Sequence, residues 1–129
     1  MLSSMRRRLK HEQGGFTLIE LLVVIIIIGI LLAIAVPSYL SFSGRANEKA
    51  AFANVRAVIP AIESYYSDKN TYDGMTIDYL RGTYDQSISS TGYVVTETNT
   101  SYCVSNSQGG KIARKAGPSA AIEIGAVCS

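Results

Sequence analysis

The 129-residue chain is poor in the side chains on which most enzymes and metal proteins rely. It has no tryptophan, two cysteines and a single histidine, His11. If the segment before Phe16 is removed, no histidine is left, which excludes Ser-His-Asp catalysis, Cys-His catalysis and every histidine-ligated metal site. No other nucleophile and base stand together in the sequence, so we expect no enzymatic activity, no cofactor and no metal.

A surplus of positive charge is also lacking outside the N-terminus. The first fifteen residues carry four Lys or Arg and one Glu, a net charge of +3. The other 114 residues carry eight Lys or Arg and nine Asp or Glu, a net charge of −1. A body without a basic surplus is not a nucleic-acid binder by charge, so we expect no specific nucleic-acid partner.

The chain does contain one long apolar run, from Phe16 to Val36. Of its 21 residues, only Thr17, Glu20 and Gly29 are not apolar. At about 1.5 Å per helical residue the run is about 31 Å long, which matches a hydrocarbon core of about 30 Å. A single span in lipid must be helical, and the arginines before it favour a cytoplasmic N-terminus. The rest of the chain is therefore expected outside the cytoplasm.

Two common kinds of segment compete as explanations of this run. A secretory signal peptide would have a shorter apolar stretch followed by small residues at a cleavage site, and neither is found here. A plain signal anchor explains the basic residues and the span. It explains neither Gly14-Gly15 immediately before the run nor Glu20 inside it. A carboxylate in a span costs about 2.5 to 3.5 kcal/mol on insertion scales, which marks it as a functional residue.

This segment resembles the N-terminus of the type IV pilins and of their relatives, the pseudopilins of type II secretion and DNA uptake. The resemblance covers about 25 residues and is specific, because it joins a basic leader, a glycine, a phenylalanine, a glutamate and an apolar run in fixed order. The matching residues are Gly15-Phe16-Thr17-Leu18-Ile19-Glu20-Leu21-Leu22-Val23-Val24, followed by Gly29-Ile30-Leu31 and Ala35-Val36-Pro37.

The resemblance implies a prepilin peptidase that cuts after Gly15 and methylates the new N-terminal residue, Phe16. It also implies that Glu20 is the assembly residue and that Pro37 loosens the helix in the filament. Glu20 would lie one helical turn from the new amine of Phe16, and could pair with that amine or with the amine of the subunit added before it. A paired charge in an apolar surround costs less than a lone one, and the resemblance favours the intermolecular pair.

Apolar periodicity predicts that the same helix continues beyond the span to about Ser67. Pro37 should kink or loosen it, because proline removes the hydrogen bond to the carbonyl of Ala33. In the second half, apolar residues recur at helical spacing and should pack against a head domain: Phe52, Val55, Ile59, Ile62 and Tyr66.

The C-terminal half of the chain reads as strands. Runs of β-favouring residues and turn signals predict a small antiparallel sheet of three or four strands, with a short helical turn before it: the turn at 75–81 and strands at 93–98, 101–105 and 120–124. The fold class is α+β, a pilin-like fold in which the second half of a long N-terminal helix packs against the sheet. We expect a cleaved leader at 1–15, a transmembrane and assembly segment at 16–44 and a head at 45–129.

The two cysteines predict a cross-link in the head. Only about sixty residues lie beyond the helix, and a core of that size benefits from a cross-link. Because the body is exported, Cys103 and Cys128 are expected to form a disulfide. The closed loop of about 26 residues is worth about 3 to 4 kcal/mol in the chain-entropy model. The alternative is two free buried thiols.

Two charged clusters in the head have opposite signs. In pilins a C-terminal disulfide bounds the variable, partner-facing region, and this one would contain Lys111, Arg114 and Lys115, which we expect on a surface loop. Asp73, Asp78 and Asp85 lack the spacing of a calcium loop, so a solvated acidic loop is the simpler interpretation. The two clusters could meet between neighbouring subunits, or both could be solvated.

Three functions remain open at this point. The first is a major subunit of an extracellular type IV pilus, a homo-oligomeric helical filament. The second is a pseudopilin of a type II secretion or DNA-uptake system. The third is a membrane-anchored extracytoplasmic binding protein, under which Gly15 and Glu20 are unexplained. The pilus subunit is favoured, because a disulfide-bounded C-terminal end is typical of pilins.

The expected partners and location follow from the resemblance. Besides further copies of the chain, the partners are the prepilin peptidase and N-methyltransferase, the inner-membrane pilus assembly machinery, and membrane lipid before assembly. The precursor is expected in the inner membrane as a single-pass protein, and the assembled subunit in a pilus on the cell surface.

Overall fold

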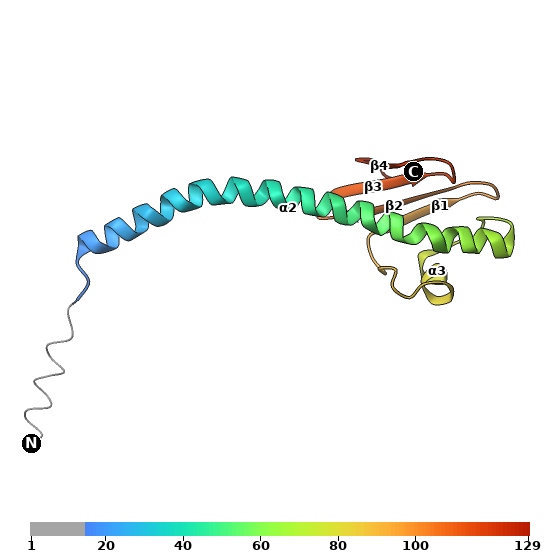
Figure 1. Cartoon of the computed structure of the whole chain (residues 1–129), viewed down its shortest axis with the longest axis horizontal. Helices are drawn as coiled ribbons and strands as arrows, with labels where there is room; N and C mark the ends of the chain where they lie inside the picture. Colours follow the sequence, from blue (N-terminus) through green and yellow to red (C-terminus); the bar gives the residue numbers. More distant parts are fainter. Residues whose placement is uncertain (1–14) are drawn as a thin grey trace, which may run out of the picture. The chain divides into compact units, whose positions relative to one another are not determined.

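The computed structural model of the protein describes residues 15–129. The predicted leader, apart from Gly15, lies outside the described residues. Two compact units are distinguished: the first ends at Tyr39 and the second is Leu40–Ser129, which we call the head unit. Helix α2 (Leu18–Lys69) belongs to both, and all other elements belong to the head unit (Figure 1): α3 (Ile77–Thr83), β1 (Tyr93–Glu97), β2 (Tyr102–Gln108), β3 (Lys111–Ala116) and β4 (Ile122–Ile124).

Helix α2 confirms the predicted long helix, with both ends within two residues of the predicted ones. It is assigned as continuous through Pro37 and Pro60. It ends at Lys69 because Asn70 adopts a φ of 55°, the left-handed conformation that closes many helices. The loosening of α2 at Pro37 stays a prediction.

The four strands form one antiparallel sheet in the order β1-β2-β3-β4. The sheet confirms the α+β class, and β1 and β2 correspond to the first two predicted strands. Strand β3 was not predicted, and the third predicted strand corresponds to β4. The turn between β2 and β3 is Gly109-Gly110, with φ of 52° and 78°. Two positive φ values are what a two-residue type I′ hairpin requires, so this glycine pair was the signal for the missed strand.

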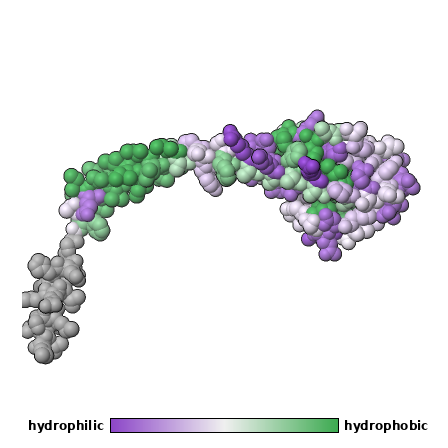
Figure 2. All heavy atoms as spheres, in the orientation of Figure 1, coloured by the Kyte–Doolittle hydropathy of each residue, from purple (hydrophilic) through white to green (hydrophobic). Residues whose placement is uncertain are grey.

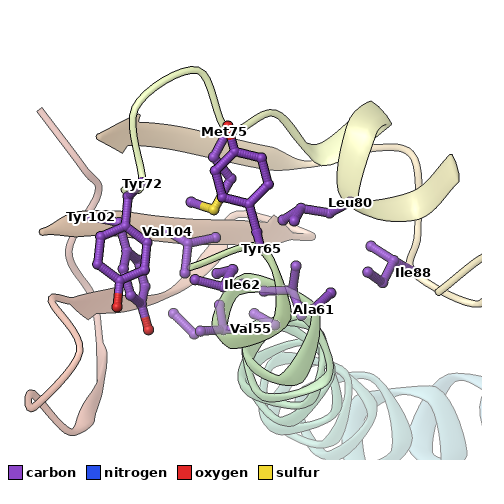
Figure 3. Packing of buried hydrophobic residues seen from close by; sticks show 13 residues of the cluster. Val55, Ala61, Ile62, Tyr65, Tyr72, Met75, Leu80, Ile88, Tyr102 and Val104 are labelled. Atoms are coloured by element: carbon purple, nitrogen blue, oxygen red, sulfur yellow. The ribbon is translucent and has the colours of Figure 1, made fainter. Parts of the chain in front are cut away.

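The core of the head unit lies between one face of α2, the inner face of the sheet and α3 (Figure 3). Val55 and Ile62 from α2, Leu80 from α3 and Val104 from β2 are completely inaccessible to solvent. Met75, in the loop before α3, fills the space between them at 1% exposure. Burial of this apolar set holds the helix, the sheet and α3 together.

The buried face of α2 is rotated from the predicted face. Tyr66, predicted to point into the core, is 37% exposed, whereas Tyr65 beside it is buried. Tyr66 instead stacks on the ring of Tyr72, with 4.5 Å between ring centroids. Ala51 and Ala61 are buried in its place. Their small side chains carry little weight in a pattern of large apolar residues, which is why the predicted face was wrong by about one position.

One buried polar group joins the sheet to the helix. Asn106 on β2 is completely buried, and its side-chain oxygen accepts a hydrogen bond from Asn54 Nδ2 on α2 at 3.0 Å. Its Nδ2 donates to the carbonyl of Thr91 at 3.3 Å. The hydroxyl of Tyr93 donates to the carbonyl of Asn54 at 2.9 Å. A buried amide with satisfied hydrogen bonds is tolerated at low cost and fixes how the two elements align.

Candidate functional site

The N-terminus of α2 is closed by a reciprocal pair of hydrogen bonds between Thr17 and Glu20. The backbone N–H of Glu20 donates to Thr17 Oγ1 at 3.2 Å, and the backbone N–H of Thr17 donates to Glu20 Oε2 at 3.4 Å. This is a capping box, in which each side chain satisfies an N–H that the helix leaves unpaired. The capping role of Thr17 was not predicted, although the Thr-x-x-Glu spacing is its sequence signal.

Glu20 therefore has a structural role in the uncut chain besides the one predicted for it. Its carboxylate lies in the first turn of α2, where the helix dipole favours a negative charge. Among residues 15–129, the carboxylate of Glu20 accepts hydrogen bonds only from Thr17, whose backbone N–H and Oγ1 both donate to Oε2. Cleavage after Gly15 would create a cationic amine on Phe16, one residue before Thr17. The structure thus brings Gly15, Phe16 and Glu20 to the same helix end.

No packing contact requires a glycine at position 15. A Cβ atom built on Gly15 meets no heavy atom within 4 Å, and the same is true of Gly29 in the middle of the apolar run. Folding of the single chain therefore tolerates a side chain at either position. If Gly15 is required for processing, the requirement comes from an enzyme that binds this segment.

The first part of α2 has no internal partner for its apolar surface. Every large apolar side chain from Phe16 to Phe42 is at least 48% exposed. Figure 2 shows this part of the chain as an almost continuous hydrophobic surface, whereas the surface of the head unit is mixed. Among the described residues, α2 is the one helix long and apolar enough to cross a membrane. Such a surface is stable only in lipid or against other protein.

The C-terminal tail is tied to the outer face of the sheet. Cys103 on β2 and Cys128 form the predicted disulfide, with their Cα atoms 5.7 Å apart. The backbone N–H of Cys128 donates to Ser105 Oγ at 3.4 Å, and Arg114 Nη1 donates to the carbonyl of Val127 at 3.3 Å. These contacts anchor the last residues of the chain to β2 and β3.

Comparison with known proteins agrees with this geometry. The model of the prokaryotic N-terminal methylation motif matches residues 10–36. A fimbrial protein of Neisseria meningitidis is 38% identical over 106 residues, which cover 77% of this chain and 62% of that protein. The type IV major pilin protein PilA of Myxococcus xanthus is 43% identical over 65 residues, 50% of this chain and 30% of that protein. The motif and these relatives support membership of the type IV pilin family.

The family includes relatives of more than one kind. The type II secretion system core protein G of Aeromonas hydrophila is 38% identical over 63 residues, 49% of this chain and 44% of that protein. The chain spans less than two thirds of the length of each of these relatives. No solved structure matches it with significance.

The predicted basic loop does not exist as a loop. Lys111, Arg114 and Lys115 all lie on strand β3, where alternate residues face opposite sides of the sheet. Lys115 is only 7% exposed, and its ammonium donates to the carbonyl of Pro118 at 3.1 Å and to that of Ala120. Lys115 is therefore occupied inside the head and is not available to a neighbouring subunit.

Arg114 also has a charged partner within the head unit. Its Nη2 lies 2.9 Å from Glu123 Oε2 on β4, the one ion pair among residues 15–129. Of the three predicted basic residues, only Lys111 is exposed and without a charged partner in the described residues. The predicted basic surface loop is therefore wrong, whereas a contact of this cluster with a neighbouring subunit is not tested by the single chain.

The three predicted acidic residues do not share one loop either. Asp73 lies in the turn after α2, Asp78 in the first turn of α3, and Asp85 after α3, where its Oδ1 accepts hydrogen bonds from Ser87. Those hydrogen bonds lower the pKa of Asp85. Residues 15–129 hold no group of three or more His, Cys, Asp or Glu side chains arranged for a metal ion.

Proposed function

We propose that this chain is the structural subunit of an extracellular type IV pilus. Residues 1–15 are the leader, a prepilin peptidase cuts after Gly15, and the same enzyme methylates the amine of Phe16. The segment 16–44 is the transmembrane and assembly part, and 45–129 is the head. The subunit does no catalysis. The precursor waits as a single-pass protein of the inner membrane, and the assembly machinery moves it into the filament.

One observation carries the proposal: the long exposed apolar surface that begins immediately after the capped end of α2. A chain with this surface cannot dissolve as a monomer, because every large apolar side chain from Phe16 to Phe42 is exposed. In the membrane, lipid covers it. In a filament, the same surfaces of other copies cover it, so assembly replaces lipid contacts by protein contacts without exposing the surface to water.

Glu20 gives this assembly its direction. Cleavage releases Phe16 as a cation at the helix end that carries the Glu20 carboxylate. In an apolar bundle either charge alone is costly, whereas a pair is much less so. We propose that the Glu20 carboxylate of an incoming subunit pairs with the Phe16 amine of the subunit before it. Pro37 supplies a point at which α2 yields during packing, because it lacks one backbone donor.

The second candidate function, a pseudopilin, has specific support from the core protein G relatives. Those matches cover 63 residues, about half of the chain. The matches to the Neisseria fimbrial proteins and the PilE1 pilin extend over 106 or 107 residues, and so include much of the head. The longer likeness favours the pilus subunit.

Electron microscopy of sheared surface fibres tests the proposal. Cells that express the chain should carry fibres in which this chain is the main protein, and cells without it should lack them. Fibres of unchanged abundance and composition in its absence would contradict a major subunit. Loss of protein secretion or DNA uptake, without loss of surface fibres, would favour the pseudopilin.

A further inference from the structure

One face of α2 in the head unit carries a row of cations, which we call the basic stripe: Arg45, Lys49 and Arg56. Their spacing of four and seven residues places them on the same side of the helix. All three are exposed, and none has an ion-pair partner in the described part of the chain. The buried residues Ala51 and Val58 lie on the opposite side of α2, so the stripe faces away from the core.

The head also contains a hollow whose lining includes acidic residues, which we call the acidic hollow. It has a volume of about 360 Å³ and lies between strand β1 and the start of α3. Asp78 and Glu97 supply its two carboxylates. The rest of its lining is mixed: Met75, Ile77, Tyr93 and Val95 are apolar, and Thr76, Ser90 and Gly92 complete it.

The composition of the hollow suits a long cationic side chain. Lysine and arginine have apolar stems that pack against apolar walls while the charged group reaches polar partners. A carboxylate that meets such a group forms a charge-assisted hydrogen bond, which is stronger than a neutral one. Neither Asp78 nor Glu97 has an ion-pair partner within residues 15–129, so both carboxylates are free to receive one.

The charges of the head are balanced in number but separated along the chain. Residues 40–129 hold eight Lys or Arg and eight Asp or Glu. Residues 40–62 hold three cations and one carboxylate, whereas residues 63–97 hold two cations and six carboxylates. Two different patches of opposite sign on one surface are what a heterologous, head-to-tail contact between identical subunits needs.

A membrane surface is a poorer partner for the stripe than a second copy. The continuous run of exposed large apolar residues on α2 ends at Phe42. Arg56 lies 14 helical residues further on, about 21 Å along the axis. The interfacial layer on each side of a bilayer is only about 5 to 8 Å thick. Lipid headgroups could therefore reach Arg45 but not Arg56, whereas a protein partner can contact the whole stripe.

We propose that the basic stripe of one subunit binds in and around the acidic hollow of another copy of this chain. The contact sets the register between heads, because charge complementarity orients subunits more than it adds affinity. The exposed residues of the basic stripe thus take the place that the sequence analysis considered for the basic residues of strand β3. The proposal rests on the proposed filament function.

Reversing the charges of the stripe or of the hollow, and then of both together, tests the contact in cells that make fibres. Arg45→Glu with Arg56→Glu, or Asp78→Arg with Glu97→Arg, should each lower the yield of sheared fibres about tenfold, the effect of losing several exposed ion pairs at every interface. All four substitutions together should restore most of the yield. Two matched controls leave stripe and hollow intact: Lys69→Glu with Arg81→Glu, and Glu63→Arg with Asp73→Arg. Both controls should give nearly wild-type fibres.

Zero-length carbodiimide cross-linking gives a second measurement on the unaltered protein. In wild-type fibres, the amine of Lys49 should become coupled to Asp78 or Glu97, and this product should be absent from detergent-solubilised subunits. Coupling of Lys49 only to other carboxylates would overturn the contact. So would normal fibres from the reversed pairs, equal losses in the controls, or no recovery in the fourfold variant. If the wild-type chain makes no fibres at all, the proposed function fails and the contact fails with it; if it does, a negative result rejects the contact alone.

Discussion

The two units of this chain bury their apolar residues in opposite ways. In the head unit, Ile62, Leu80 and Val104 are completely buried among residues of the same chain. In the first unit, equally apolar side chains such as Ile26 and Leu31 are 51% and 60% exposed. The head is thus a folded domain with its own core, whereas the apolar surface of the first unit is left for lipid or other protein to cover. The same type of residue stabilises a fold in one unit and, in the proposed filament, would drive association in the other.

The largest expected effect is on processing of the first unit. Gly15→Val should leave the leader attached in essentially all molecules, with a normally folded head, because the added side chain meets nothing in the chain itself. Gly29→Val is the matched control, since Gly29 is equally free of contacts, and it should be cleaved. The mass of the chain in membrane extracts decides between them. Efficient cleavage of the Gly15 variant would reject this position as the processing site.

The next effect separates the charge of Glu20 from its capping role. Glu20→Gln keeps a side chain that can complete a capping box but removes the charge. Thr17→Ala removes the hydroxyl that accepts from the Glu20 N–H but keeps the charge. If the charge serves assembly, Glu20→Gln should lower fibre yield more than about tenfold, because an unpaired ammonium in an apolar surround is costly. Thr17→Ala should cost about 1 kcal/mol of helix stability and leave most fibres. Similar fibre yields for the two variants would contradict the separation.

A pair of isoleucines tests the difference in burial directly. Ile62→Ala should lower the free energy of unfolding of the head by about 2 to 5 kcal/mol, because it leaves a cavity in a completely packed core. Ile26→Ala should leave head stability unchanged, since Ile26 makes no part of that core. Thermal unfolding of the full chain in detergent, followed by the near-ultraviolet circular dichroism of its tyrosines, measures both. An equal loss in both variants would show that the two units do not stabilise themselves separately.

The disulfide should matter to the head and not to the apolar unit. Replacing Cys103 and Cys128 by serine removes a cross-link between residues 25 positions apart. The chain-entropy model gives a loss of about 3 kcal/mol in head stability. Membrane insertion and leader cleavage should be normal. Thiol labelling of the native wild-type protein is the control, and two freely reactive cysteines would be incompatible with the cross-link.

The smallest predicted effect concerns the close approach of the β2–β3 turn to α2. A Cβ on Gly109 would lie 2.1 Å from Asn47 Nδ2, whereas one on Gly110 meets nothing within 4 Å. Both glycines have positive φ. Gly109→Ala should therefore lower the free energy of unfolding by about 1 to 3 kcal/mol, through backbone strain and overpacking against Asn47. Gly110→Ala should lose only the part that comes from backbone strain. Adding Asn47→Ala to the Gly109 variant should recover part of the loss in thermal unfolding. No difference between the two glycines would contradict the close approach.

The sequence was most informative where one physical property dominates a long stretch. The apolar run and the continuation of α2 were predictable, because length and periodicity average over many residues. The disulfide followed from the small size of the head and from only two cysteines. The long helix, the small antiparallel sheet and the family were all predictable in this way.

The errors occurred where single tertiary contacts decide the outcome. In strand β3, Lys-Ile-Ala-Arg-Lys-Ala, Arg114 stands next to Lys115, so the strand lacks the alternation of apolar and polar residues that marks a half-buried strand. Lys115 is buried there only because the carbonyls of Pro118 and Ala120 fold back over its ammonium. Similarly, Tyr65 enters the core and Tyr66 does not because of how α2 is rotated against the rest of the head. No local pattern contains that rotation.

The central claim is that the exposed apolar surface beginning at Phe16 is the surface through which the chain polymerises. The most direct test is the mass of the N-terminal peptide of this chain in purified surface fibres. The account predicts a peptide that begins at Phe16 with a methylated amine. A chain that enters fibres with its leader attached, or that begins beyond Val36 and so lacks the apolar run, would contradict it.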